Sequence, residues 1–260
     1  MPLTYGQYLN LDALLSLQQP RSDDPEHDEM LFIIIHQVYE LWFKQIIHEL
    51  EHVQRAMETN NKSDIFQGLK RILTILKTLV SQVDILETLT PVSFSSFRAR
   101  LENASGFQSV QFRELEFILG KRNAAAVERL RDHSGQCERL VQRLHQPALW
   151  DSFLHLLRLN GLDVPLALIQ RDVSLPCPTS LELQANLLEI YRKRSTLMQL
   201  CERLVDLDEG IQEWRYRHIK MVERTIGNKQ GTGGSAGVQY LKNTLFSPLF
   251  PDLWAIRSAL

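Results

Sequence analysis

The stretch that decides the fold is residues 28–59, DEMLFIIIHQVYELWFKQIIHELEHVQRAMET. Large side chains recur there at steps of 4, 3, 4, 3 and 4 residues, in the order Phe32, His36, Tyr39, Phe43, Ile46 and Leu50. Such steps keep one face of an α-helix turned in one direction. The stretch therefore predicts a long helix with one face in the core, and it places His36 on that inward face.

The same periodicity continues along most of the chain. We expect a second helix over about 63–88, a shorter helix from Pro91 to about 101, a helix over about 107–119 that ends at Gly120, and two long helices between 178 and 226. Residues 121–177 resemble short helices separated by glycine and proline, and a short helical segment closes the chain after 238. The sequence thus predicts one all-α domain over residues 1–260, a bundle of long helices with a smaller helical insertion over 121–177.

Composition excludes several classes of protein. The 260 residues carry 29 Lys and Arg against 31 Asp and Glu, a net charge of −2, which argues against a nucleic-acid-binding protein. The three cysteines are far apart and form no C-x-x-C pair, so a reducing compartment is favoured. The longest apolar run, residues 30–35, is far shorter than the ~20 residues of a membrane span. We expect a cytoplasmic protein with no nucleic-acid or membrane partner.

Two histidines stand out because the helical pattern turns both toward the core. His218 belongs to a seam with steps of 3 and 4 residues that contains Leu204, Leu207, Ile211, Trp214, Met221 and Thr225. A neutral, hydrogen-bonded core histidine is the commoner case, and an axial ligand to haem iron is the alternative. Because His36 faces inward from another helix, one histidine could bind the metal while the other faces a ligand.

Other motifs are weaker candidates for a functional site. Residues 48–52 match H-E-x-x-H, the motif of zinc proteases. At 100° per residue, however, His48 and His52 point roughly 160–200° away from the inward stripe, which disfavours a zinc site. The glycine-rich segment 231–237 follows a helix rather than a strand, so it is a flap over a ligand or a plain linker, not a dinucleotide fingerprint. Cys177 between two prolines resembles an exposed thiol more than a haem thiolate. Arg98 is either solvated or a carboxylate clamp.

Several ordered blocks of sequence together resemble one family. They are TYG at 4–6, HDEMLFIIIHQ at 27–37, ELWFK at 40–44, LETLT at 86–90, FR at 97–98, ASGFQS at 104–109, WRYRH at 214–218 and GTGGS at 231–235. This set resembles the tryptophan 2,3-dioxygenases. The resemblance implies a homotetramer with one haem b per subunit, which inserts O2 across the indole C2–C3 bond of L-tryptophan to give N-formyl-L-kynurenine, the first step of the kynurenine route.

The resemblance also implies roles for individual residues. It makes His218 the proximal haem ligand and His36 the distal histidine that accepts a hydrogen bond from the indole N–H. It assigns the substrate carboxylate to Arg98 and the amino-acid backbone to Thr232. The remaining substrate-binding positions that it implies are Phe32, Ile33, Ile34, Ile35, Phe94, Leu101, Ser105, Gly106 and the N-terminal tyrosines Tyr5 and Tyr8, some of which reach a neighbouring subunit in the family.

Some positions depart from the family pattern. Phe94 and Phe112 stand where some bacterial members have tyrosine, and Ala236 replaces a loop serine. These changes bear on substrate preference more than on the class of reaction. One alternative function is that of a related haem-dependent monooxygenase, which hydroxylates a substituted tryptophan or another aromatic amino acid. The other alternative is a helical scaffold that binds no haem and is not an enzyme.

Overall fold

The structure is a computed structural model of the chain, and it describes residues 2–22, 26–130, 137–229, 238–242 and 244–260. Every regular element in these ranges is helical, which confirms the predicted all-α fold. The longest helices are α3 (His27–Glu58), α4 (Lys62–Leu86) and α12 (Thr196–Ile226). Medium-length helices are α6 (Val110–Ile118), α9 (Leu149–Leu159) and α11 (Leu181–Arg192).

Short helices complete the chain. They are α1 (Tyr5–Leu9), α2 (Leu11–Leu15), α5 (Pro91–Phe97), α7 (Ala124–Leu130), α8 (Cys137–Leu144), α10 (Leu166–Ile169), α13 (Val238–Lys242) and α14 (Pro251–Ala255). Among the described residues, 3-10 turns cover Arg98–Leu101, Gly106–Gln108 and Ile256–Ala259. The region 121–177 holds the short helices α7, α8 and α10, as expected, and also the longer helix α9; its residues 131–136 lie outside the described ranges.

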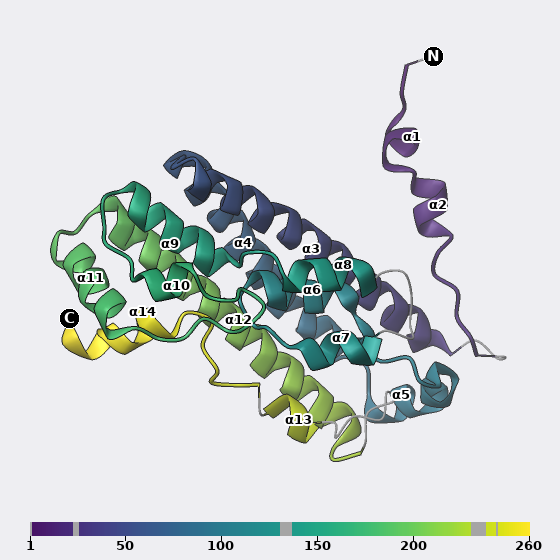
Figure 1. Cartoon of the computed structure of the whole chain (residues 1–260). Coiled ribbons are helices and arrows are strands. Elements are labelled where there is room, and N and C mark those ends of the chain that lie inside the picture. Colours follow the sequence, from purple (N-terminus) through teal and green to yellow (C-terminus); the bar gives the residue numbers. More distant parts are fainter. Residues whose placement is uncertain (1, 23–25, 131–136, 230–237, 243) are drawn as a thin grey trace.

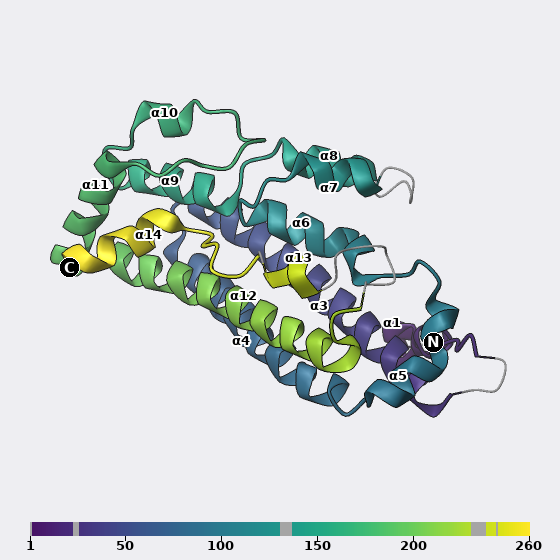
Figure 2. The same ribbon diagram turned by 90° about the horizontal axis from the view of Figure 1, so that it is seen from below.

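Helix α4 packs along both of the other long helices, α3 and α12 (Figures 1 and 2). Its predicted stripe is fully inside the protein, because Ile65, Leu69, Ile72, Leu76, Leu79, Val83 and Leu86 are all buried. Helices α6 and α9 cover another side of α3, and α5 contacts both α3 and α12 at one end of the bundle. Helices α3 and α12 thus face one another across a space that α4 and α5 border.

Local sequence signals set the helix ends. Thr90 accepts a hydrogen bond from the Ser93 amide at 3.0 Å, and Pro91 occupies the first turn of α5. Asn61 and Ser109 cap α4 and α6 in the same way. Gly120 follows α6 with φ of +92°, a backbone conformation that favours glycine, as the sequence predicted.

A buried carboxylate fixes the C-terminal segment to α12. Asp208 is fully buried and accepts hydrogen bonds from the amides of Leu249 and Phe250, at 2.8 and 3.2 Å, and from the Trp254 indole N–H at 2.9 Å. Asp252 in turn accepts from the Ser180 amide at 3.0 Å. These donors would be costly to bury without an acceptor, so the two carboxylates hold the last turns of the chain against α11 and α12.

The N-terminal arm, residues 2–22, projects from the body of the protein (Figure 1). Its helices α1 and α2 contain no buried residue. The arm is attached at its base, where the buried Glu29 accepts from the amides of Arg21 and Ser22 at 2.7 and 3.1 Å and Gln37 donates to the Leu17 carbonyl at 3.1 Å.

By length and composition alone, α3 is the one helix among the described residues that could cross a membrane. One face of its C-terminal half is buried in the bundle, where α3 packs against α4, α6 and α9. We therefore assign α3 to the core of the bundle.

Close packing of α3 on α4 yields a test of the fold. A Cβ on Gly68 would lie 2.5 Å from Val53 Cγ2, a stiff β-branched side chain. Gly68→Ala should therefore lower the free energy of unfolding by about 1–3 kcal/mol, measured by urea denaturation, although alanine favours helices. The matched control is Gly210→Ala on α12, where the new Cβ would meet the flexible tip of Leu76 at 3.2 Å and the stability should change by less than about 1 kcal/mol. A Gly68→Ala protein as stable as the unaltered one would contradict this packing.

Candidate active site between helices α3 and α12

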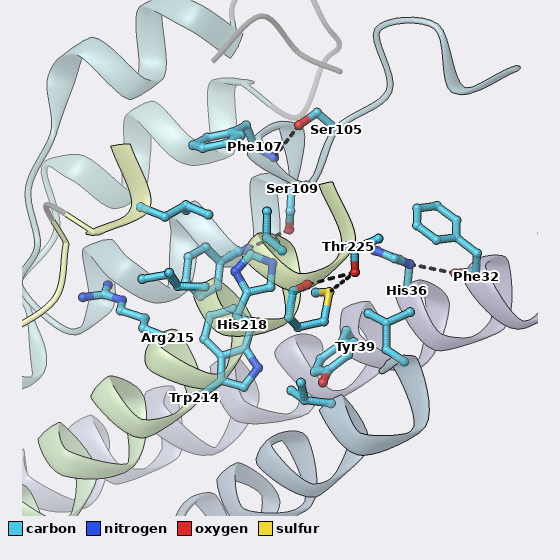
Figure 3. A pocket seen from close by; sticks show the side chains of 18 of the residues that line it. Phe32, His36, Tyr39, Ser105, Phe107, Ser109, Trp214, Arg215, His218 and Thr225 are labelled. Atoms are coloured by element: carbon cyan, nitrogen blue, oxygen red, sulfur yellow. Dashed lines mark hydrogen bonds between the residues drawn. The ribbon is translucent and has the colours of Figure 1, made fainter. Parts of the chain in front are cut away.

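A cavity of about 270 Å³ lies between α3 and α12, closed at one side by α5 and by residues 98–112 (Figure 3). Its lining is mostly apolar: Phe32, Phe43, Val83, Leu86, Leu89, Phe94, Leu101, Phe107, Phe112, Ile219, Met221, Val222 and Ile226. The polar and charged side chains of the lining include His36, Glu40, Arg98, Arg113, Glu116, Arg215 and His218. This combination is typical of a site for an aromatic ligand or an apolar cofactor.

His218 enters the cavity from α12. Its ring lies parallel to the Trp214 indole, with 5.4 Å between ring centroids and 11° between planes (Figure 3). Burial, together with the smaller effect of the nearby His36, lowers the pKa of His218 to about 4. The imidazole is therefore neutral at physiological pH, the form in which histidine binds a metal.

Trp214, which stacks on His218, also packs against helix α3. Its indole contacts Tyr39 and Phe43 of α3, with ring centroids 6.3 and 5.9 Å apart, and Phe112 at 5.0 Å. The Tyr39 hydroxyl donates to the Leu79 carbonyl of α4 at 2.8 Å. Aromatic contacts thus fix the direction of the His218 ring.

His36 reaches the cavity from α3, as the inward stripe predicted. Its Nδ1 lies 2.7 Å from the Phe32 carbonyl oxygen (Figure 3). Because a carbonyl oxygen can only accept, Nδ1 carries the proton and the neutral ring keeps Nε2 as an acceptor. Burial lowers the pKa of His36, although the Phe32 carbonyl and the Glu40 carboxylate act in the opposite direction. His36 can therefore accept a hydrogen bond from a ligand in the cavity.

Aromatic rings pack beside His36. The Phe32 ring lies 4.1 Å from the His36 ring, 5.7 Å from Phe94 and 5.5 Å from Phe97, measured between centroids. Because Phe94 and Phe97 belong to α5, the Thr90–Pro91 cap that starts this helix also positions one wall of the cavity. The wall can pack against a flat aromatic ligand.

The turn after α5 adds polar groups. Arg98 and Leu101 line the cavity from the 3-10 turn that follows α5, and Ser105 and Gly106 line it from the next turn. Ser105 Oγ accepts a hydrogen bond from the Phe107 amide at 3.4 Å (Figure 3). The structure therefore brings Phe32, His36, Phe94, Arg98, Leu101, Ser105, Gly106 and His218 to one cavity.

An ion-pair network that the sequence analysis missed lines the same cavity. Arg215 of α12 donates to Glu116 of α6 at 2.8 Å, and Arg113 also pairs with Glu116. The Arg215 side chain is only 6% exposed, and burial lowers its pKa. Glu116 and Arg215 are 99 residues apart, so no local sequence signal could have paired them.

Other expected site residues lie away from the cavity. Ile33, Ile34 and Ile35 do not line it, because consecutive helical residues point about 100° apart and, between positions 32 and 36, Phe32 and His36 are the ones that face this side. Ile34 is 42% exposed, whereas Ile35 is buried in the core. Tyr5 and Tyr8 are each 75% exposed on the N-terminal arm. Thr232 and Ala236 lie outside the described residues.

The weaker motifs do not form a site. His48 is exposed, Glu49 is paired with Arg71 at 2.8 Å, and His52 lies 3.7 Å from Asp64. Within the described ranges, no group of three His, Cys, Asp or Glu side chains could hold a metal ion. Cys177 lies outside this cavity, and burial raises the pKa of its thiol.

The fold and the cavity define a class of protein, an all-α bundle that presents two neutral histidines to one apolar core cavity. Sequence comparison narrows this class, because the sequence pattern of the tryptophan 2,3-dioxygenase family matches residues 1–165 and 181–260. The chain belongs to the tryptophan 2,3-dioxygenase family, which confirms the resemblance seen in its sequence.

Relatives match over nearly their whole length. The tryptophan 2,3-dioxygenase of Herpetosiphon aurantiacus is 57% identical over 258 residues, which cover 99% of this chain and 98% of the relative. The tryptophan 2,3-dioxygenase of Anaeromyxobacter sp. strain K is 54% identical, and the match covers 99% of this chain and 96% of the relative. The tryptophan 2,3-dioxygenase of Pseudomonas fluorescens is 41% identical, and the match covers 99% of this chain and 91% of the relative.

The Glu116 network yields a prediction about stability. Glu116→Gln removes the carboxylate that Arg215 and Arg113 share, and it leaves the Arg215 charge buried without a partner. We expect the free energy of unfolding to fall by about 3–5 kcal/mol in urea denaturation.

The matched control for this prediction is Glu223→Gln. Glu223 also pairs with two cations, Lys220 and Lys242, at 2.9 and 2.8 Å, but on the surface. Its loss should leave stability nearly unchanged, because water replaces the exposed ion pairs. Equal losses in the two variants would show that burial does not strengthen the Glu116 network.

Proposed function

We propose that this protein is a haem-dependent dioxygenase that inserts both atoms of O2 across the indole C2–C3 bond of L-tryptophan and releases N-formyl-L-kynurenine. Membership of the tryptophan 2,3-dioxygenase family supports the reaction. The observation that carries the proposal is the convergence of two histidines with different roles, His218 and His36, on one apolar cavity.

The residues present fit haem b. His218 offers a neutral imidazole from a rigid helix, among side chains that suit an apolar macrocycle. Haem also carries two carboxylates, and Arg98, Arg113 and Arg215 line the cavity. Arg215 Nη1 is buried without an acceptor and could take a carboxylate oxygen. When bound in the ferrous state, haem supplies the redox chemistry that makes O2 reactive toward the indole ring.

His36 orients the substrate in this proposal rather than removing its proton. The indole N–H is a very weak acid, and an imidazole with a pKa below its usual value of 6.5 is a poor base for it. A hydrogen bond from the indole N–H to His36 Nε2 instead holds the ring in one orientation. The Phe32 and Phe94 rings complete this wall by packing against the indole.

Arg98 binds the substrate carboxylate in this proposal. A carboxylate that enters an apolar cavity must find a cation, since an unpaired buried charge is costly. Arginine can meet it with two parallel N–H bonds. We propose that Thr232 and the segment 231–237 contribute to the same end of the substrate, and that Leu101, Ser105 and Gly106 form the remaining walls.

We further propose a homotetramer located in the cytoplasm. The N-terminal arm exposes 69–75% of the surfaces of Leu3, Tyr5, Tyr8 and Leu15, which favours burial against another subunit. The arms would bring Tyr5 and Tyr8 to a neighbouring subunit. Three free cysteines, Cys137, Cys177 and Cys201, agree with a reducing compartment.

The direct test of the reaction is the mass of the product. Reduced, haem-loaded protein should convert L-tryptophan into a product heavier by two oxygen atoms. A product heavier by one oxygen atom would establish the monooxygenase instead. A protein that binds no haem and turns over no tryptophan would support the scaffold.

His36→Ala tests the positioning role of His36. We expect turnover of L-tryptophan to fall roughly ten- to a thousand-fold but to remain measurable, in line with the loss of orientation. His48→Ala is the control, because His48 is exposed on the same helix. Complete inactivity of His36→Ala with normal haem content and normal tryptophan binding would mean that His36 performs an essential proton transfer.

Arg98→Lys tests the carboxylate clamp. Lysine keeps the charge but cannot make two parallel N–H bonds, so L-tryptophan should bind about 2–5 kcal/mol more weakly in equilibrium titrations. Binding of indoles without a carboxylate should hardly change. Arg100→Lys is the control, since Arg100 lies on the same turn but does not line the cavity. Equal losses for both kinds of ligand would contradict the clamp.

A further inference from the structure

A second pocket, of about 410 Å³, lies next to the active-site cavity. It forms where the end of α6, the start of α9 and the segments around 176 and 248 meet. Arg113, Glu116 and Thr244 line both spaces and form a shared wall. None of the residues assigned above to the substrate or to the axial position lines this second pocket.

The lining of the second pocket carries more positive than negative charge. Four cations, Arg113, Lys121, Arg122 and Arg171, face two carboxylates, Glu116 and Asp252. Both carboxylates are already engaged: Glu116 pairs with Arg113 and Arg215, and Asp252 accepts from the Ser180 amide and from Gln184 Nε2 at 3.0 and 2.8 Å. The two carboxylates therefore do not balance the four cations of the lining.

Two of the four cations have no carboxylate partner among the described residues. Arg122 is only 9% exposed and donates to two backbone carbonyls, of Arg143 and Gln146, at 2.8 and 2.5 Å, while its Nε has no acceptor. Lys121 is half-buried, and its side-chain ammonium forms no hydrogen bond or ion pair with the described residues. Burial is the main cause that lowers the pKa of Lys121 to about 8; the charges of Arg215 and Arg113 act in the same direction, and the Glu116 and Asp208 carboxylates oppose them. Arg171, in contrast, pairs with Asp151 at 2.6 Å.

The rest of the pocket is apolar. Trp150, Pro176, Pro248, Leu249 and Pro251 line it. A small inorganic anion would pair with the cations but would leave these apolar side chains in contact with water. A ligand with one anionic group and a compact apolar body matches both parts of the lining.

We propose that this pocket binds a small organic carboxylate. The carboxylate accepts a hydrogen bond from Lys121 Nζ and lies in the positive field of Arg122, and the apolar body packs against Trp150 and the neighbouring prolines. Charge-assisted hydrogen bonds of this kind compensate the cost of burying Arg122 and half-burying Lys121, neither of which forms an ion pair with a described carboxylate.

Benzoate is a suitable probe, with the uncharged, similarly shaped benzamide as the control compound. Isothermal titration of the haem-loaded protein should show benzoate binding at least ten-fold more tightly than benzamide. Lys121→Gln should weaken benzoate binding at least ten-fold, and Lys121→Arg should largely retain it. Lys193→Gln, a change at an exposed lysine, should have no effect. Lys121 does not line the active-site cavity, so these results are independent of benzoate binding beside Arg98.

Cys177 provides a second readout in the unaltered protein, because it lines the second pocket and Cys137 does not. Benzoate should slow alkylation of Cys177 by iodoacetamide and leave that of Cys137 unchanged. Equal binding of benzoate and benzamide, or unchanged benzoate affinity in a folded Lys121→Gln protein, would overturn the proposal. So would binding of inorganic phosphate without binding of benzoate, or unprotected Cys177.

Discussion

The packing of α4 against both α3 and α12 is the constraint on which the rest of the structure depends. Helix α4 holds its two neighbours at a fixed separation, and the absence of a side chain at Gly68 permits the close approach to Val53 of α3. The space that remains between α3 and α12 is bridged by the rings of Tyr39, Phe43 and Trp214. A histidine on each helix then faces that space, so the cavity is a consequence of helix packing.

The mostly apolar surroundings of the cavity give the two histidines their chemistry. Desolvation lowers the pKa of both His36 and His218, which leaves each imidazole neutral. The Phe32 carbonyl then fixes the proton of His36 on Nδ1, whereas His218 stacks on Trp214. The same low polarity makes a fixed cation necessary wherever a carboxylate is to be bound, and it explains why the Arg215 charge is compensated by Glu116.

The sequence predicted the long helices and the two inward histidines because these features depend on spacing within one helix. The stripes from Ile65 to Leu86 and from Leu204 to Met221 needed no knowledge of the partner helix. Local patterns could not predict the Glu116–Arg215 pair, the capture of the C-terminal segment by Asp208 or the second pocket, since each joins segments distant in the chain. Ile33, Ile34 and Ile35 illustrate another limit, because a motif contains neighbours in sequence that point in different directions on a helix.

The central claim is that α12 presents His218 to the cavity as the axial ligand of haem, and the most direct measurement is the haem content of His218→Ala. The variant should retain its helical far-UV circular dichroism and lose its haem or hold it weakly, seen as a reduced Soret band after reconstitution and gel filtration. His52→Ala, a change outside the cavity, should bind haem normally. Full haem occupancy with an unchanged ferrous spectrum in His218→Ala would contradict the account.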